Sequence, residues 1–90
     1  MIDLNKYNLD EDDIYVIESI YASCESVTNL SLCYKNKIKF DLDSWDGKTI
    51  TAYFSDDNFI KFNSVDDLLV NFKIEDKPLI EIIKDVDFIW

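Results

Sequence analysis

The spacing of hydrophobic and polar residues first follows the period of a helix. Residues 10–13 are all acidic, which suits the start of a helix because carboxylates there meet the free amide groups and the positive end of the helix dipole. Apolar residues then recur three and four positions apart, at Ile14, Ile17, Ile20, Tyr21 and Cys24. We therefore predict an amphipathic helix that begins near Asp10, ends near Cys24 and buries one apolar stripe.

The period changes to two in the middle of the chain, where apolar and polar residues alternate as in strands that bury one face. Segments 30–34 and 38–43 flank residues 35–37, where the alternation breaks and we predict a hairpin turn. Asp46-Gly47 is a dipeptide favoured in two-residue hairpin turns, so we predict a tight turn there and a third strand over 48–54. A polar turn at 55–58 leads into a fourth strand, 59–62. The pattern predicts an antiparallel meander of four strands.

Two short helices are predicted after the meander. Ser64 with an acidic residue three positions later, Asp67, is close to a capping box and starts a helix through Leu68, Leu69 and Phe72. Pro78 suits the first turn of a second helix, in which the apolar positions are Leu79, Ile82, Ile83 and Val86.

The order of these elements predicts one α+β domain spanning residues 1–90: an N-terminal helix, a four-stranded antiparallel meander sheet and two short C-terminal helices packed on one sheet face. The other sheet face should then remain open. If the register follows the alternation, the open face carries Lys39, Asp41, Asp43, Thr49, Thr51 and Tyr53.

Composition agrees with a packed globule, because 48% of the residues are hydrophobic and the chain has only one Gly and one Pro. No segment approaches the roughly 20 apolar residues of a membrane span, and the first residues lack the features of a signal peptide. We therefore expect a cytoplasmic protein, in the host cytoplasm if a phage encodes it, that is a monomer or dimer. In that compartment Cys24 and Cys33 remain thiols, and both fit buried positions.

Charge is the unusual property of this chain. It has 19 acidic residues against 9 basic ones, all of them Lys, which gives a formal net charge of −10. Such a field repels nucleic acid and anionic membranes, so we expect no direct binding to either, and it attracts a basic protein surface. The simpler alternative is that the charge only keeps the protein soluble.

The residue types leave little room for catalysis. The chain has no His, its single Gly excludes a glycine-rich phosphate loop, and its two Cys lack the spacing of a zinc site. We predict no enzyme activity, no cofactor and no metal. One alternative stays open, a small carboxylate-based hydrolase or Ca²⁺ binder using Asp41, Asp43 and Asp46, although the register of segment 41–52 does not match an EF-hand loop.

Carboxylates cluster at predicted turns and on the predicted open face, where Trp45 also lies beside the Asp46-Gly47 turn. Trp is a frequent anchor of protein interfaces, and its ring either stays exposed there or folds back on the sheet. We expect contacts with a partner from Asp41, Asp43, Trp45, Asp46, Asp56 and Asp57.

These observations lead to two related functional hypotheses. In the first, the protein is an inhibitor that occupies the basic, nucleic-acid-binding surface of a target such as a nuclease, as a DNA mimic does. In size and charge alone it is similar to the anti-CRISPR and anti-restriction proteins of phages and mobile elements. In the second, it is an immunity or antitoxin protein that neutralises a basic nuclease toxin by the same charge complementarity.

Overall fold

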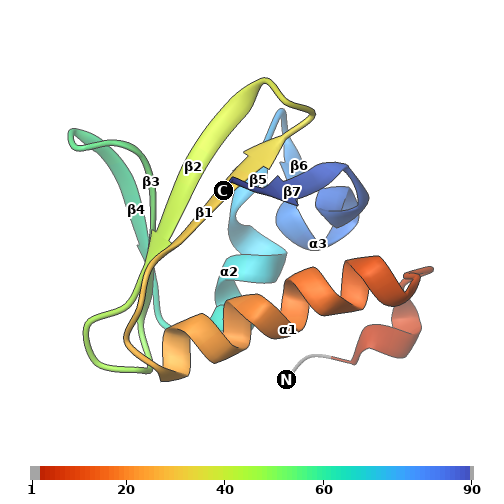
Figure 1. Ribbon diagram of the computed structural model, residues 1–90, viewed down its shortest axis with the longest axis horizontal. Helices are drawn as coiled ribbons and strands as arrows, with labels where there is room; N and C mark the ends of the chain where they lie inside the picture. Colours follow the sequence, from red (N-terminus) through yellow and green to blue (C-terminus); the bar gives the residue numbers. More distant parts are fainter. Residues whose placement is uncertain (1–2, 90) are drawn as a thin grey trace.

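The computed structural model describes residues 3–89, and these form the predicted α+β arrangement. Figure 1 shows the helices gathered on one side of a twisted sheet. In chain order the elements are the 3₁₀ helix η1 (Leu4–Lys6), α1 (Glu11–Glu25), β1 (Leu30–Tyr34), β2 (Ile38–Asp43), β3 (Ile50–Ser55), β4 (Asn58–Phe62), α2 (Val65–Asn71), β5 (Lys73–Ile74), β6 (Lys77–Pro78), α3 (Leu79–Ile82), the 3₁₀ helix η2 (Ile83–Asp85) and β7 (Val86–Phe88).

Helix α1 begins where its acidic start predicts. Asp10 caps the helix: its carboxylate accepts a hydrogen bond from the Asp13 amide at 3.0 Å, and the Asp13 carboxylate accepts one from the Asp10 amide at 3.1 Å. This reciprocal pair satisfies two amide groups at the helix start and explains why Asp13 is buried. The buried apolar side chains of α1 are Val16, Ile17, Ile20 and Cys24, whereas Ile14 and Tyr21 are only half-buried.

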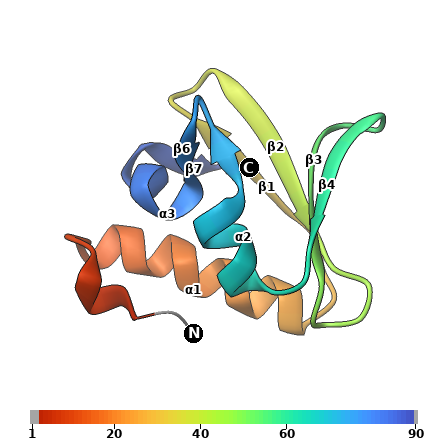
Figure 2. The ribbon, with the colours of Figure 1, turned by 180° about the vertical axis from the view of Figure 1, so that it is seen from behind.

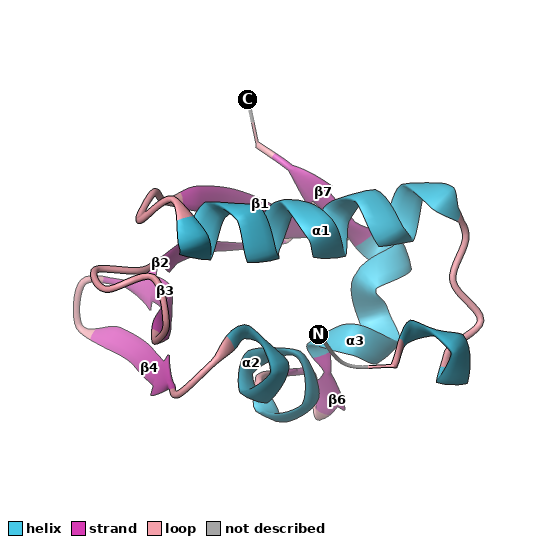
Figure 3. Cartoon of the chain, turned by 90° about the horizontal axis from the view of Figure 1, so that it is seen from below, coloured by secondary structure: helices cyan, strands magenta, loops and turns pink. Residues whose placement is uncertain are grey.

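The main sheet has five strands in the order β4-β3-β2-β1-β7, so the predicted four-stranded meander is confirmed and a fifth strand joins it. All neighbouring strands are antiparallel. Figure 3 shows α1 running lengthwise beside β1 and β7, at one edge of the sheet, while α2 follows β4, at the opposite edge. The two helices therefore cover the same apolar face of the sheet, each near a different edge.

A cluster of phenylalanine rings joins the helices to the sheet. The Phe72 ring, at the end of α2, lies 5.5 Å from the rings of Phe40 and Phe54 and 5.8 Å from that of Phe62. These three partners come from β2, β3 and β4 respectively. The Phe72 side chain is completely buried, so it fastens α2 under three adjacent strands.

The predicted C-terminal helix is shorter than expected. Pro78 caps α3, which ends at Ile82; after η2 the chain becomes extended, and Val86 lies in β7 rather than on a helix. Strand β7 pairs with the free side of β1, and the Lys35 amide donates to the Asp85 carbonyl at 2.8 Å. The helical spacing of the apolar residues was misleading at Val86, because this buried residue would fit the apolar stripe of a helix but lies in a strand.

The turns also differ from the prediction. Asp46-Gly47 does not form a two-residue hairpin turn, because residues 44–49 make a longer loop between β2 and β3, although Gly47 has the expected positive φ of 76°. Consecutive residues with positive φ occur instead at Lys35-Asn36, between β1 and β2, and at Glu75-Asp76, between β5 and β6. None of these four residues is Gly, so a search of the sequence for Asp-Gly dipeptides does not locate these two turns.

No helix in the described part of the chain combines the length and the apolar character that crossing a membrane requires.

We expect the substitution Phe72→Ala to lower the free energy of unfolding by about 3–5 kcal/mol, because it removes a buried ring that contacts three others. Urea unfolding followed by circular dichroism measures this change. The matched control is Phe59→Ala on β4, where the ring is 54% exposed and the loss should stay below about 1 kcal/mol. Equal losses in the two variants would contradict the central role of Phe72.

Candidate functional site

The sheet face opposite the helices is open, and its composition follows from the register. Asp41 on β2 lies opposite Ser31 on β1 and Tyr53 on β3, and Asp43 lies opposite Thr51. Because side chains alternate between faces, these residues share the face that the helices leave free. The face continues onto β4 through Phe59 and Lys61, and onto β7 through Asp87.

Two side chains of the loop between β2 and β3 form hydrogen bonds within the loop. The Ser44 hydroxyl donates to the Thr49 carbonyl at 2.7 Å and accepts from the Gly47 amide at 3.1 Å. The Asp46 carboxylate accepts from the amides of Lys48 and Thr49, both at 2.8 Å, and from the Thr49 hydroxyl at 3.1 Å. Asp46 therefore shapes the loop, and because its side chain is also exposed, its predicted contact with a partner stays a prediction.

This loop holds Trp45 away from the core. The Trp45 side chain is 80% exposed, so of the two alternatives for this ring the exposed one is correct. It lines a cavity of about 300 Å³ together with the adjacent faces of Tyr53 and Phe59, whose ring centroids are 5.4 Å apart. Asp43, Asp46 and Lys61 also line this cavity. An exposed Trp beside two partly exposed rings offers apolar area to a partner.

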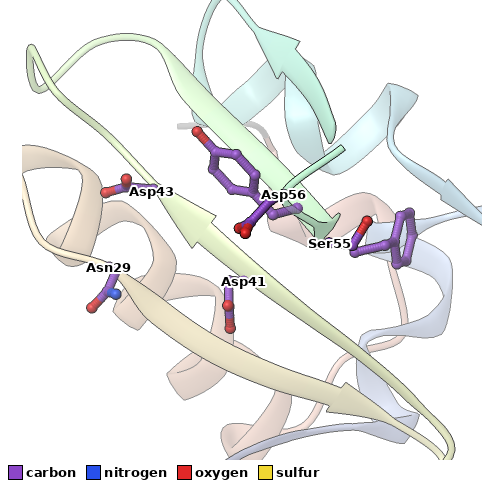
Figure 4. A pocket seen from close by; sticks show the side chains of 7 residues that line it. Asn29, Asp41, Asp43, Ser55 and Asp56 are labelled. Atoms are coloured by element: carbon purple, nitrogen blue, oxygen red, sulfur yellow. The ribbon is translucent and has the colours of Figure 1, made fainter. Parts of the chain in front are cut away.

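A second cavity lies next to the first. Asp41, Asp43 and Asp56 line it together with Tyr53. Figure 4 shows Asp41 and Asp43 on one strand and Asp56 across from them, near the end of the neighbouring strand. Asp43 lines both cavities, so it joins the carboxylates to the aromatic residues.

Five of the six predicted contact residues thus line the two cavities: Asp41, Asp43, Trp45, Asp46 and Asp56. Asp57 is exposed in the β3–β4 turn but lines neither. The open face is not uniformly acidic, because Lys39 and Lys61 also lie on it. Thr51, predicted to be open, is buried.

Two residues of this surface were not predicted from the sequence. Phe59 belonged to a short apolar run, and only the register of β4 places it on the open face. Val27 follows the end of α1, has a positive φ of 55° and is 47% exposed beside Trp45 and Asp43 in a third cavity. A positive φ is strained in a β-branched residue, and Gly is the residue usually found in this conformation after a helix end. Val27 therefore has a strained backbone next to the open face.

Several other carboxylates have structural roles that account for their presence. Asp10 and Asp13 cap α1, as described above. Asp67 accepts a hydrogen bond from the Asn63 amide at 3.1 Å and from the Asn71 side chain at 2.6 Å, and the Tyr21 hydroxyl donates to Asp66. Asp41, Asp43 and Asp56 have no comparable bond to a described side chain, so the open face carries acidic groups that the fold itself does not require.

The carboxylates do not converge on a common centre. In residues 3–89, no three side chains among His, Cys, Asp and Glu are grouped so that they could hold a metal ion. Asp41 and Asp43 project from one strand onto an open surface, and the Asp46 carboxylate already accepts hydrogen bonds from the loop.

Comparison of the chain with protein-family models, with curated proteins and with solved structures gives no match, so none of these comparisons indicates its function.

We expect the pKa of Asp46 to lie below its ordinary value of 3.8, because the amides of Lys48 and Thr49 donate to the charged carboxylate. The stability from these bonds should be fully present above pH 3.8 and should be lost as the pH falls through the lowered pKa. Titration of the Asp46 side-chain carbon by NMR measures the shift. Thr49→Val removes one hydroxyl donor and should raise this pKa; an unchanged value would contradict the assignment.

Proposed function

We propose that the protein is a non-catalytic binding module that occupies the basic, nucleic-acid-binding surface of a target protein with the open face of its sheet. The observation that carries this proposal is the combination, on one uncovered face, of an aromatic group centred on Trp45 and acidic side chains that accept no hydrogen bond from residues 3–89. We call this the acidic aromatic face, defined as Asp41, Asp43, Trp45, Tyr53, Asp56 and Phe59.

The two kinds of residue on this face contribute differently to binding. Carboxylates speed up the encounter with a basic surface and fix its orientation, but exposed charges add little affinity by themselves. Exposed aromatic rings supply the apolar area that a partner can bury, and Trp and Tyr are frequent anchors of interfaces. Asp43 lies at the border of the two cavities, so a basic side chain bound there would meet a carboxylate and the aromatic rings together.

A target whose basic groove normally binds nucleic acid fits this face, because carboxylates on the face would replace phosphates as partners of its Lys and Arg residues. A DNA-mimic inhibitor of a phage or mobile element, of the anti-CRISPR or anti-restriction kind, would act in this way in the host cytoplasm. It would need no cofactor. An immunity or antitoxin protein that neutralises a basic nuclease toxin would use the same face, and it remains our alternative function.

The third hypothesis, a carboxylate-based hydrolase or Ca²⁺ binder, has no specific observation in its favour. Asp46 is occupied by the loop, and Asp41 and Asp43 lie side by side on an open strand rather than in a deep cleft.

The test of the proposed function is capture of partners from host and phage-infected lysates on the immobilised protein, with elution along a salt gradient. A nucleic-acid-binding protein that elutes with salt, and whose own nucleic-acid binding is blocked by the purified protein, would support the proposal. Failure of the captured protein to lose nucleic-acid binding would overturn it. A neutralised nuclease toxin would favour the immunity alternative.

We expect the double substitution Asp41→Asn/Asp43→Asn to weaken binding of the captured partner on the order of tenfold at low salt and to flatten its salt dependence. The control is Glu18→Gln/Glu25→Gln, which removes the same charge from exposed positions on α1. Isothermal titration at several salt concentrations measures both. If the control weakens binding as much, overall charge rather than this face is responsible.

We expect Trp45→Ala to cost the complex about 2 kcal/mol or more, which is roughly a thirtyfold loss of affinity, because an anchor ring would be removed. The stability of the free protein should change by less than about 0.5 kcal/mol, since the ring is exposed. Tyr15→Ala, at an exposed aromatic on α1, is the matched control and should leave affinity unchanged. Full affinity in the Trp45 variant would remove the aromatic group from the interface.

A further inference from the structure

Strand β4 is an open edge of the main sheet. It pairs with β3 on one side only and is the last strand in the sheet order. Four of its five residues are exposed, including Phe59 at 54% and Ile60 at 47%, and only Phe62 is buried. An edge strand of this length with exposed apolar side chains is a template for pairing with another strand.

The apolar exposure occurs on both faces of β4. Phe59 lies on the open face beside Tyr53, whereas Ile60 lies opposite Ala52, on the face that the helices cover elsewhere. Figures 1 and 2 show the β3–β4 hairpin projecting away from the helices, and Ile60 in this hairpin is exposed. A strand added beside β4 would therefore find apolar side chains both above and below the sheet.

We propose that β4 pairs with β4 of a second copy of this chain, antiparallel and with the two-fold axis at Ile60, so that two five-stranded sheets become one continuous sheet. In this register Ile60 meets Ile60 of the second copy, Phe59 meets Lys61, and Asn58 meets Phe62. Phe59 and Lys61 share a face, so the pair is suited to a cation–π contact. An axis perpendicular to the sheet also places both acidic aromatic faces on the same side of the dimer.

Each copy carries a net charge of −10, so overall charge opposes the pairing, and the register matters for where the individual carboxylates come to lie. The acidic residues of the β3–β4 turn are Asp56 and Asp57, and the register places them opposite Ser64 and Asn63 of the second copy. The Asn63 amide donates to the Asp67 carboxylate at 3.1 Å, so Asp67 also lies near this end of the pairing. No carboxylate therefore lies directly opposite another along the paired strands. The remaining repulsion acts between Asp57 and the Asp67 carboxylate at Asn63 of the second copy and between the two molecules as a whole, and salt screens both.

The other edge of the sheet does not offer the same pairing. Strand β7 has three residues, and a two-fold pairing centred on it would place Asp87 directly opposite Asp87 of the second copy. Pairing of β4 with β7 of another copy would leave one free edge at each end and would build an open fibre rather than a closed dimer. The symmetric β4 pair is the arrangement that closes.

The test measures oligomeric state by analytical ultracentrifugation of the full chain from micromolar to near-millimolar concentration, at low and high salt. We expect a monomer–dimer equilibrium in which added salt strengthens the dimer, because screening reduces the repulsion between two acidic copies. This inference is independent of the proposed function, whose complex with a basic partner should weaken with salt. A monomer at every concentration and salt level would overturn the inference.

The position of Ile60 on the two-fold axis allows a sharper test. Ile60→Lys and Ile60→Asp should each abolish the dimer, because like charges then face each other, while an equimolar mixture should form a Lys–Asp heterodimer. Val70→Lys, at an exposed apolar residue on α2, is the matched control and should still form the dimer. Dimers that persist in either single Ile60 variant, or an equimolar mixture that stays monomeric, would show that β4 does not pair in this register.

Discussion

The Phe72 ring is the contact on which the arrangement of the fold depends. It follows α2 directly, and its ring partners come from β2, β3 and β4, so one side chain joins the last strands of the meander to the helical layer. The Leu79 amide donates to the Phe72 carbonyl at 2.8 Å, which also fixes the segment that leads into α3. Packing around Phe72 thus places both short helices on one face of the sheet.

This one-sided packing explains why the possible functional surfaces lie where they do. A chain of 90 residues has enough apolar side chains to cover one face of a five-stranded sheet, and α1, α2 and α3 all contribute to that face. The opposite face stays uncovered, as does the projecting end of the β3–β4 hairpin. The acidic aromatic face and the free edge of β4 are therefore two consequences of the same shortage of covering elements.

Local signals in the sequence were sufficient for most of the fold. The acidic start of α1 and the alternation in residues 30–43 predicted elements within a residue or two of their observed bounds, because capping and burial act over short distances. Strand β7 was missed because its conformation depends on the free side of β1, more than 50 positions earlier in the chain. The prediction of a two-residue turn at Asp46-Gly47 was wrong because the side chains of Ser44 and Asp46 stabilise a longer loop.

The candidate site also depends partly on local sequence signals and partly on contacts between distant segments. Asp41 and Asp43 could be placed on the open face from their alternation alone, whereas Phe59 could not, since its face depends on the register of β4. The structure also separates acidic residues that the sequence could only count. The carboxylates of Asp10, Asp13, Asp46 and Asp67 accept hydrogen bonds that stabilise helix starts and a loop, so the fold accounts for their presence. What distinguishes Asp41, Asp43 and Asp56 is that the fold leaves their carboxylates without such a role, beside aromatic rings that it also leaves exposed.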